Sequence, residues 1–219
     1  MQDDESQLKT SLSREEILAE SVGAFSRNGY RGTNLQDVAE VLGVTRQAIY
    51  YHFRNKHAIL LALFESFFDR LGEGVYEARA AQPDPALQFE AMLRAHIVTV
   101  ARHPEMSSVF TREFESLVPD ERSKIQQRRR LYQGMFSESL AAAQAAGRVR
   151  RDLPVGPTMS LLFGAANWTF RWFREDRGEM SAEQLAEMMM DLFRSGFGAD
   201  EAPAARGNGR RAARVGKKR

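Results

Sequence analysis

Apolar residues recur every three to four positions along most of this 219-residue chain. That spacing places them on one face of an α-helix, whereas a half-buried β-strand would alternate apolar and polar residues in steps of two. No alternating pattern competes with the helical one. The sequence therefore predicts an all-α fold of about nine helices.

Capping residues, prolines and glycines divide this pattern into separate helices. Ser13 and Glu16 form the capping box of a first helix, and Gly29 stops it. Pro119 ends a short helix, and Gly147 closes a longer one. From residue 55 onwards the predicted helices are 55–79, 85–102, a short helix ending at 117, 120–146, 155–174 and 181–197.

Two short helices around a glycine turn occupy the stretch from Thr33 to Lys56. In this pair, Thr33 or Asn34 caps the leading helix. Gly43 ends that helix in the left-handed conformation that turns the chain sharply. Thr45 caps the second helix. The leading helix of the pair has one apolar face, made of Leu35, Val38, Ala39 and Leu42. This arrangement is typical of a helix-turn-helix motif that binds DNA.

The outward face of the second helix has the side chains that a major groove requires. Arg46 can make a bidentate contact to a guanine edge and Gln47 one to an adenine edge, while Thr45 can reach a phosphate or a thymine methyl. Hydroxyl, imidazole and ammonium groups that follow can hold phosphate oxygens. The residues predicted to contact DNA are Thr33, Gln36, Thr45, Arg46, Gln47, Tyr50, Tyr51, His52 and Lys56. His52 has an alternative role as a histidine packed at a helix end.

The segment LQDVAEVLGVTRQAIYYHFRNKHAIL, residues 35–60, resembles the DNA-binding signature of TetR-family transcriptional regulators. With the preceding helix, the resemblance covers about a quarter of the chain. It implies an N-terminal three-helix DNA-binding domain, a long connecting helix and a C-terminal helical domain that binds an effector and dimerises. The alternative is a helical domain that does not touch DNA, because short amphipathic helices broken by glycine also occur there.

Four segments follow from these observations. They are a disordered N-terminal segment (1–12), the helix-turn-helix domain (13–56), the effector-binding and dimerisation domain (57–199) and a disordered basic tail (200–219). Residues 206–219 hold seven Lys and Arg and no acid, so the formal charge of +2 becomes −5 without them. The tail either adds non-specific phosphate contacts or only aids solubility.

Composition narrows the class of protein further. The chain has no cysteine, which excludes disulfide scaffolds, thiolate zinc sites and cysteine nucleophiles and fits a reducing cytosol. The acidic N-terminus lacks the apolar stretch of a signal peptide, and apolar runs such as 59–64 are far shorter than the ~20 residues of a membrane helix. We therefore expect a cytoplasmic protein without a membrane partner, cofactor or metal.

A second group of residues is predicted to form an elongated apolar effector pocket. Bulky, soft or amphipathic side chains recur there at helical spacings. They are Phe67, Met92, His96, Phe110, Phe114, Tyr132, Phe136 and Phe163, joined by Asn167, Trp168 and Arg171. For each of the first eight, ordinary core packing is the competing interpretation.

Trp168, Arg171 and Trp172 are expected on one face of the helix 155–174. Two indoles and a guanidinium can stack an adenine and bind a phosphate, as a coenzyme A thioester requires. The pattern is similar to that of TetR-family regulators of lipid and sterol breakdown that respond to acyl-CoA. An aromatic dimer contact with Arg171 in a salt bridge is the alternative.

The last two helices are predicted to form a homodimer interface, because the resemblance implies a four-helix bundle between protomers. The contact residues expected there are Leu161, Ala165, Trp172, Leu185, Met188, Met189 and Leu192. They could instead close the core of the monomer. A two-fold dimer places two recognition helices ~34–36 Å apart and requires a near-palindromic operator.

These expectations combine into a repressor that binds double-stranded DNA and is released by a small-molecule effector, with a fatty or sterol-derived acyl-CoA as the candidate. An activator or a corepressor-dependent regulator fits the same sequence. Two other classes compete: an architectural DNA-binding protein without an effector, and a helical metal-dependent hydrolase using His96, His103 and Glu105. The hydrolase lacks an HExxH motif or a nucleophile with an evident base.

Overall fold

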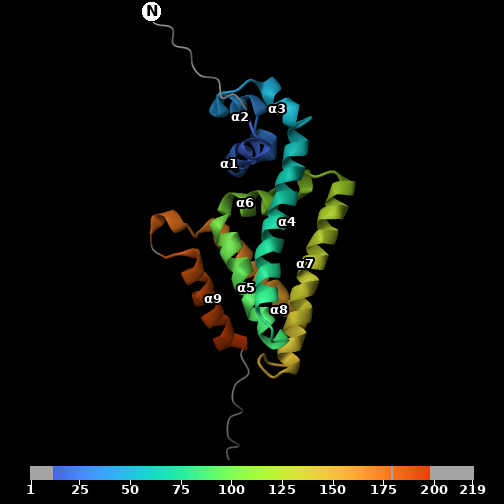
Figure 1. Ribbon diagram of the computed structural model, residues 1–219, viewed down its shortest axis with the longest axis vertical. Coiled ribbons are helices and arrows are strands. Elements are labelled where there is room, and N and C mark those ends of the chain that lie inside the picture. Colours follow the sequence, from blue (N-terminus) through green and yellow to red (C-terminus); the bar gives the residue numbers. More distant parts are fainter. Residues whose placement is uncertain (1–11, 179, 198–219) are drawn as a thin grey trace, which may run out of the picture.

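A computed structural model describes residues 12–178 and 180–197, and in these residues nine α-helices, three short 3-10 helices and no β-strand are present (Figure 1). The predicted all-α fold is confirmed. The segments 1–11 and 198–219, which hold most of the two predicted disordered ends, lie outside the described residues. In chain order the elements are α1 (Arg14–Gly32), α2 (Leu35–Leu42), α3 (Arg46–His52), α4 (Lys56–Ala81), α5 (Pro85–Arg102), α6 (Pro104–Arg112), η1 (Phe114–Ser116), α7 (Pro119–Ala145), α8 (Val155–Asn167), η2 (Trp168–Arg171), η3 (Glu175–Arg177) and α9 (Ala182–Phe197).

Helices α1, α2 and α3 form a small head at one end of the molecule (Figure 1). The capping box opens α1 as predicted, with Ser13 Oγ accepting from the Glu16 backbone N–H at 3.1 Å and Glu16 Oε2 accepting from the Ser13 N–H at 2.9 Å. Gly29 interrupts the helix with φ 74°. Apolar side chains of all three helices, among them Phe25, Val38 and Ile49, are buried in one cluster. We call this cluster the head core.

The long helix α4 belongs to the head and to the rest of the molecule, which we call the body. It starts at an N-cap made by Asn55, whose Oδ1 accepts from the Ala58 N–H at 2.8 Å. Its first half, including Leu60 and Phe64, completes the head core. Its second half, including Leu71, packs in the separate cluster of the body. A rigid helix of 26 residues spans about 39 Å, so it connects the two ends of the molecule directly.

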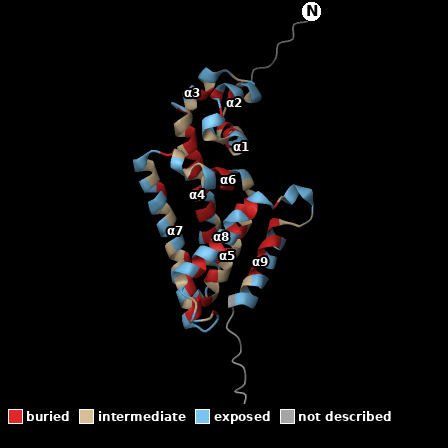
Figure 2. Cartoon of the chain, turned by 180° about the vertical axis from the view of Figure 1, so that it is seen from behind, coloured by how far each residue is buried: buried red, intermediate tan, exposed pale blue. Residues whose placement is uncertain are grey.

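The body surrounds a second apolar cluster, the body core. Helix α5 lies in its middle and contacts α4, α7, α8 and α9. Figure 2 shows the buried residues on the facing sides of these helices and the exposed residues on their outer sides. The core is rich in aromatic and sulfur-containing side chains, including Phe89, Met92, Phe136 and Phe163. Several residues from which an effector pocket was predicted therefore pack within this core.

The predicted helix 155–174 is wrong at its C-terminal end, because α8 stops at Asn167 and a 3-10 turn follows. Thr169 Oγ1 donates to the Ala166 carbonyl at 2.8 Å, and the Trp172 and Phe173 N–H groups both bond to the Thr169 carbonyl. Arg174 Nη1 donates to two further carbonyls, at 2.8 and 2.7 Å. These bonds satisfy backbone groups that a continuing helix would have used.

One buried polar group of the head has no hydrogen-bond partner among the described residues, the Ser21 hydroxyl of α1. An unpaired buried hydroxyl costs free energy, and alanine is the better helix former. We expect Ser21→Ala to raise the free energy of unfolding by ~1 kcal/mol, measured as a higher midpoint in thermal unfolding. The control Ser13→Ala removes the α1 cap and should lower it by ~1 kcal/mol. A lower midpoint for Ser21→Ala would show that the hydroxyl has a bonding partner.

Candidate nucleic-acid interface and effector-binding region

The turn between α2 and α3 has the geometry that the sequence predicts. Gly43 adopts φ 68° and ψ 31°, and its N–H bonds back to the end of α2. No atom lies within 4 Å of a Cβ added at Gly43, so the left-handed backbone and not a lack of space explains the glycine. Thr45 then caps α3, its Oγ1 accepting from the Ala48 N–H at 3.3 Å. This turn fixes α3 on the surface of the head.

One face of α3 is open to solvent and carries the side chains predicted to read bases. Ile49 is fully buried and anchors the helix, while Thr45, Arg46 and Gln47 are exposed. Arg46 donates from Nε and Nη2 to the Tyr50 hydroxyl at 3.1 and 2.7 Å, and its guanidinium lies 5.2 Å from the Tyr50 ring centre. Tyr50 thus positions Arg46, a role that helical spacing i, i+4 would have revealed in the sequence.

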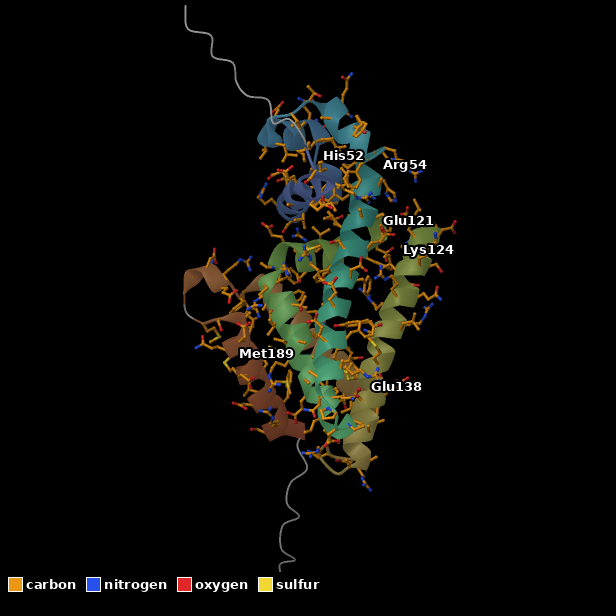
Figure 3. The ribbon with its side chains drawn as sticks, viewed as in Figure 1. His52, Arg54, Glu121, Lys124, Glu138 and Met189 are labelled. Carbon is orange, nitrogen blue, oxygen red and sulfur yellow. The ribbon has the colours of Figure 1, made fainter. Side chains whose placement is uncertain are left out.

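The other residues predicted to contact DNA lie around this face with different exposure. Tyr51 is 89% exposed, and Gln36 on α2 is exposed and donates to Glu40 Oε1 at 3.1 Å. His52 is half-buried at the end of α3, where the Tyr51 ring contacts it edge-on (Figure 3). Tyr51 therefore has the freest hydroxyl for a phosphate oxygen on this surface.

The prediction for Thr33 is wrong, and Lys56 makes contacts within the protein that the sequence did not predict. Thr33 is 3% exposed, and its hydroxyl donates to the carbonyls of Ala24 and Gly29, so it closes α1 and cannot reach a phosphate. Asn34 is the cap of α2. Lys56 Nζ donates to the Tyr30 carbonyl at 2.7 Å and the Thr33 carbonyl at 2.9 Å. Two of its three ammonium donors are therefore used to hold α1 against α4.

A polar contact that the sequence did not predict joins the head to the body. His57 of α4 bonds through Nε2 to Glu121 of α7, and its Nδ1 lies 3.5 Å from the Tyr30 hydroxyl of α1. Burial and the nearby Glu121 carboxylate raise the pKa of Tyr30. His57 and Glu121 are 64 residues apart, so no local spacing could have paired them. The contact fixes the angle between α1, α4 and α7.

Inside the body core, three polar side chains form one hydrogen-bonded chain. His96 Nδ1 lies 2.9 Å from the Tyr132 hydroxyl, and Nε2 lies 3.1 Å from Asn167 Oδ1. Because an amide oxygen only accepts, His96 donates from Nε2 and accepts the Tyr132 proton at Nδ1. Burial lowers the pKa of His96 to about 4, against the Asn167 bond that raises it, and burial raises the pKa of Tyr132. His96 is therefore neutral at pH 7.

The structure brings only part of the predicted pocket set together around His96. The rings of Tyr132, Phe136 and Phe163 lie 4.8 to 6.0 Å from the His96 ring, and Met92 and Phe67 belong to the same cluster. Phe110 and Phe114 lie nearer the head, although the Phe110 ring is also 5.2 Å from the Phe67 ring. They pack under the Arg129 guanidinium at the junction of the head and body, beside Phe64. These two residues do not face the polar chain.

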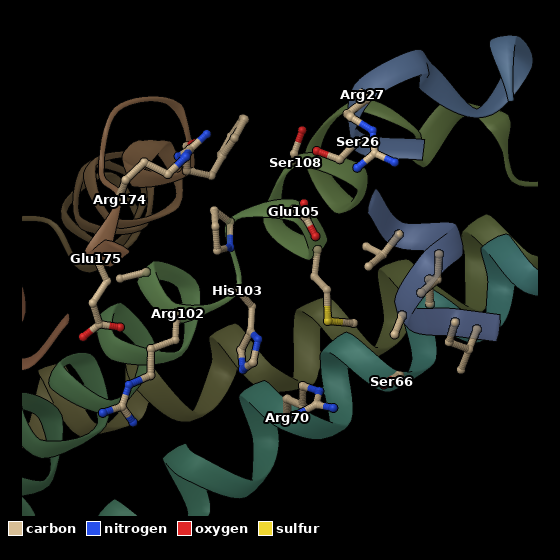
Figure 4. Close-up of a pocket in the computed structure, with 18 of the residues that line it drawn as sticks. Ser26, Arg27, Ser66, Arg70, Arg102, His103, Glu105, Ser108, Arg174 and Glu175 are labelled. Carbon is tan, nitrogen blue, oxygen red and sulfur yellow. The ribbon is translucent and has the colours of Figure 1, made fainter. Parts of the chain in front are cut away.

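The separately predicted tryptophan cluster lies at the surface where α8 ends. Trp168 and Trp172 are 56% and 53% exposed, and the Arg171 guanidinium carbon is 5.5 Å from the Trp168 ring centre. Because the chain is not α-helical here, Trp172 is not a neighbour of Trp168 on one α-helical face, which corrects the expectation. Arg171 also lines a cleft of about 1040 Å³ between the head and the body (Figure 4).

Two family models match this chain. The model described as "Bacterial regulatory proteins, tetR family" matches residues 17–63, which cover the head and the start of α4. The model described as "Tetracyclin repressor-like, C-terminal domain" matches residues 82–197, more than half of the chain. The chain belongs to the TetR family.

Several TetR-family proteins are similar over most of their length. The HTH-type transcriptional repressor KstR2 of Mycobacterium tuberculosis is 22% identical to this chain. The match covers 84% of this chain and 92% of the length of KstR2. The fatty acid metabolism regulator protein of Bacillus subtilis is 24% identical, and the match covers 83% of this chain and 94% of that protein. The crystal structure of AibR with isovaleryl coenzyme A and operator DNA has a TM-score of 0.72 and 24% identity, over 81% of this chain and 96% of that one.

TetR-family regulators bind operator DNA as dimers, and this chain has an exposed apolar face on its last helices. Leu161 and Leu192 are 76% and 65% exposed, and Ala165 and Met188 are exposed beside them. We refer to these exposed apolar residues, together with Trp168 and Trp172, as the α8–α9 face. Leu185 and Met189 do not belong to it, which corrects the predicted interface. They are buried in the body core, because they lie on the side of α9 that packs on α5 (Figure 3).

The structure does not bring together His96, His103 and Glu105, the residues of the hypothetical hydrolase metal site. Both ring nitrogens of His96 are hydrogen-bonded inside the body core, whereas His103 and Glu105 line the cleft. Within the described residues, no three His, Cys, Asp or Glu side chains are close enough to hold a metal ion. No described helix of this TetR-family chain is long and apolar enough to cross a membrane.

Proposed function

We propose that this chain is a dimeric transcriptional repressor that binds a near-palindromic operator through α3 and is released by a small-molecule effector. The observation that carries the proposal is the exposed face of α3, where Tyr50 holds Arg46 and Gln47 is free beside it. A two-fold dimer through the α8–α9 face would present two such helices to successive turns of the major groove. The protein would act in the cytoplasm and would not be an enzyme.

For the effector we propose an acyl thioester of coenzyme A. Similar proteins include a fatty acid metabolism regulator and a regulator crystallised with isovaleryl coenzyme A. In this chain, the aromatic body core would accept an apolar acyl chain after rearrangement, and the chain of His96, Tyr132 and Asn167 would offer hydrogen bonds to a carbonyl within it. Trp168 and Arg171, at the outer end of α8, would contact the coenzyme A part.

The proposed coupling between effector and operator runs through α4 and the head–body contacts. An effector that binds best to a body in which α4 is tilted moves both recognition helices away from their groove spacing. The effector therefore binds the tilted conformation more tightly than the DNA-binding conformation. By linkage, this difference in binding free energy, typically ~1–3 kcal/mol, is the free energy by which operator binding is weakened. The contact of Tyr30, His57 and Glu121 would transmit such a tilt to α1.

A release assay tests this proposal. An operator is selected from random duplex DNA, and release of the labelled operator is then measured with a fatty acyl-CoA and with the matching free acid. We expect the thioester to release DNA at much lower concentration than the acid. In Arg171→Gln, which loses only a surface cation, this preference should shrink by about tenfold. Equal release by thioester and acid would contradict the coenzyme A effector while leaving operator binding established.

A further inference from the structure

The cleft between the head and the body is built from elements of both. Helix α1 forms one wall, and α4, α6 and the segment from η2 to η3 form the others. Its volume of about 1040 Å³ is at the upper end of the range of small-molecule sites. Apart from Arg171, no residue predicted to bind the effector lines it. The cleft is therefore a space that the predicted pocket does not account for.

Basic side chains outnumber acidic ones around this cleft. Six arginines and four carboxylates line it, and one of the carboxylates, Glu175, already accepts from the Ala182 N–H at 2.9 Å. Four of the six arginines have polar partners within the protein. Arg27 pairs with Glu20, Arg102 pairs with Glu183, Arg112 donates to the Ser26 carbonyl, and Arg174 donates to the end of η2. These contacts shape the walls.

Arg70 of α4 differs from these arginines. Among the described residues it has no carboxylate and no hydrogen-bond acceptor, although it lines the cleft beside His103 (Figure 4). The hydroxyls of Ser66 and Ser108, on facing helices, also line the cleft without a hydrogen-bond partner in this part of the chain. Five guanidinium N–H donors and two hydroxyls thus line the cleft without acceptors among the described residues.

The electrostatics of His103 agree with this description. Its pKa is lowered by burial and then by the positive charges of Arg70 and Arg102, although Glu105 lies only two residues away. A histidine whose charged form is disfavoured by its neighbours reports a positive potential at that point. An anion bound at Arg70 would reverse the effect and raise the pKa of His103.

We infer that this cleft binds the phosphate groups of the effector, with Arg70 as their main cation and Ser66 and Ser108 as hydrogen-bond donors. A guanidinium group can donate two parallel hydrogen bonds to the oxygens of one phosphate. A cleft of this volume also has room for a nucleotide diphosphate. The inference rests on the proposed function, because it assigns a part of the effector to a place. Since α1 forms one wall, an occupant would contact head and body at once and bias the angle between them.

The test measures binding of coenzyme A, which has no acyl chain, to the full-length protein by calorimetry at one fixed salt concentration. We expect Arg70→Gln to weaken binding about tenfold or more, because it removes a charge-assisted contact. The matched control is Arg130→Gln on the exposed side of α7, outside the cleft, which should bind as the unaltered protein does. Adenosine 3′,5′-bisphosphate and inorganic pyrophosphate separate nucleotide from simple phosphate recognition, and either should lose affinity in Arg70→Gln if it binds.

His103 gives a second measurement that does not depend on folding changes at residue 70. The chain has four histidines, so the His103 imidazole signal is identified in NMR spectra by its loss in His103→Gln. Its pKa should rise when coenzyme A is added. An unchanged His103 pKa at saturation, or equal affinities of Arg70→Gln and Arg130→Gln, would overturn the inference. Operator binding without effector is measured in the same samples. Normal operator binding with unchanged coenzyme A affinity in Arg70→Gln would overturn only the role of the cleft, whereas a lack of operator binding would contradict the proposed repressor.

Discussion

Leu161→Arg is expected to convert the protein to monomers and to reduce operator affinity at least ~100-fold, towards the level of non-specific DNA binding. Leu161 is 76% exposed in the protomer, so its replacement removes nothing from the body core. In a two-fold interface through the α8–α9 face, each protomer would contribute one new charge to the interface. Two buried, unpaired guanidinium groups would then oppose association.

Sedimentation and operator titration at the same protein concentrations check this expectation. The matched control is Leu131→Arg, because Leu131 of α7 is 68% exposed and does not belong to the α8–α9 face. That variant should stay dimeric and bind the operator normally. A dimeric Leu161→Arg protein with full affinity would place the interface on another surface, and an equal loss in both variants would point to a general effect of the added charge.

Arg46→Ala should lower operator affinity by ~1–3 kcal/mol per half-site and relax the preference for one base pair in each half. The expected size follows from its geometry, since the Tyr50 hydroxyl holds the guanidinium on the exposed face of α3 and little entropy is lost on binding. Binding to a library of operators with single base-pair changes measures both effects.

Tyr51→Phe provides the comparison for Arg46→Ala. The Tyr51 side chain is 89% exposed, and a hydroxyl that binds a phosphate oxygen contributes to affinity without reading sequence. Its loss should weaken every operator in the library by a similar factor. If Arg46→Ala weakened all sequences equally, Arg46 would be a phosphate contact and another residue of α3 would read the base.

Features that depend on neighbouring positions in the chain could be predicted from the sequence. The capping box of Ser13 and Glu16, the left-handed Gly43 and the cap at Asn55 each need only residues within one helical turn, and all three occur in the structure. The family resemblance of residues 35–60 rests on the same local order. The fold class and the helix-turn-helix followed from such signals.

Features that depend on how distant helices pack could not be predicted in this way. Helix α9 is apolar on two sides, and spacing alone does not say that Leu185 and Met189 face the protomer's own core while Met188 and Leu192 face outwards. Thr33 has a side chain suited to DNA, but the arrangement of α1 encloses it. The cleft at the head–body junction is assembled from four separate stretches of the chain, so no motif marks it.

The shared helix α4 has a consequence for how the protein loses its structure. Its first half is buried in the head core and its second half in the body core, and Met106 and Phe110 pack against both clusters. The head therefore has no boundary at which it could melt alone, and heating should unfold both regions in a single cooperative transition. An exchange of heads between relatives would then succeed only if the α4 and α6 side chains that face the new head are exchanged with it.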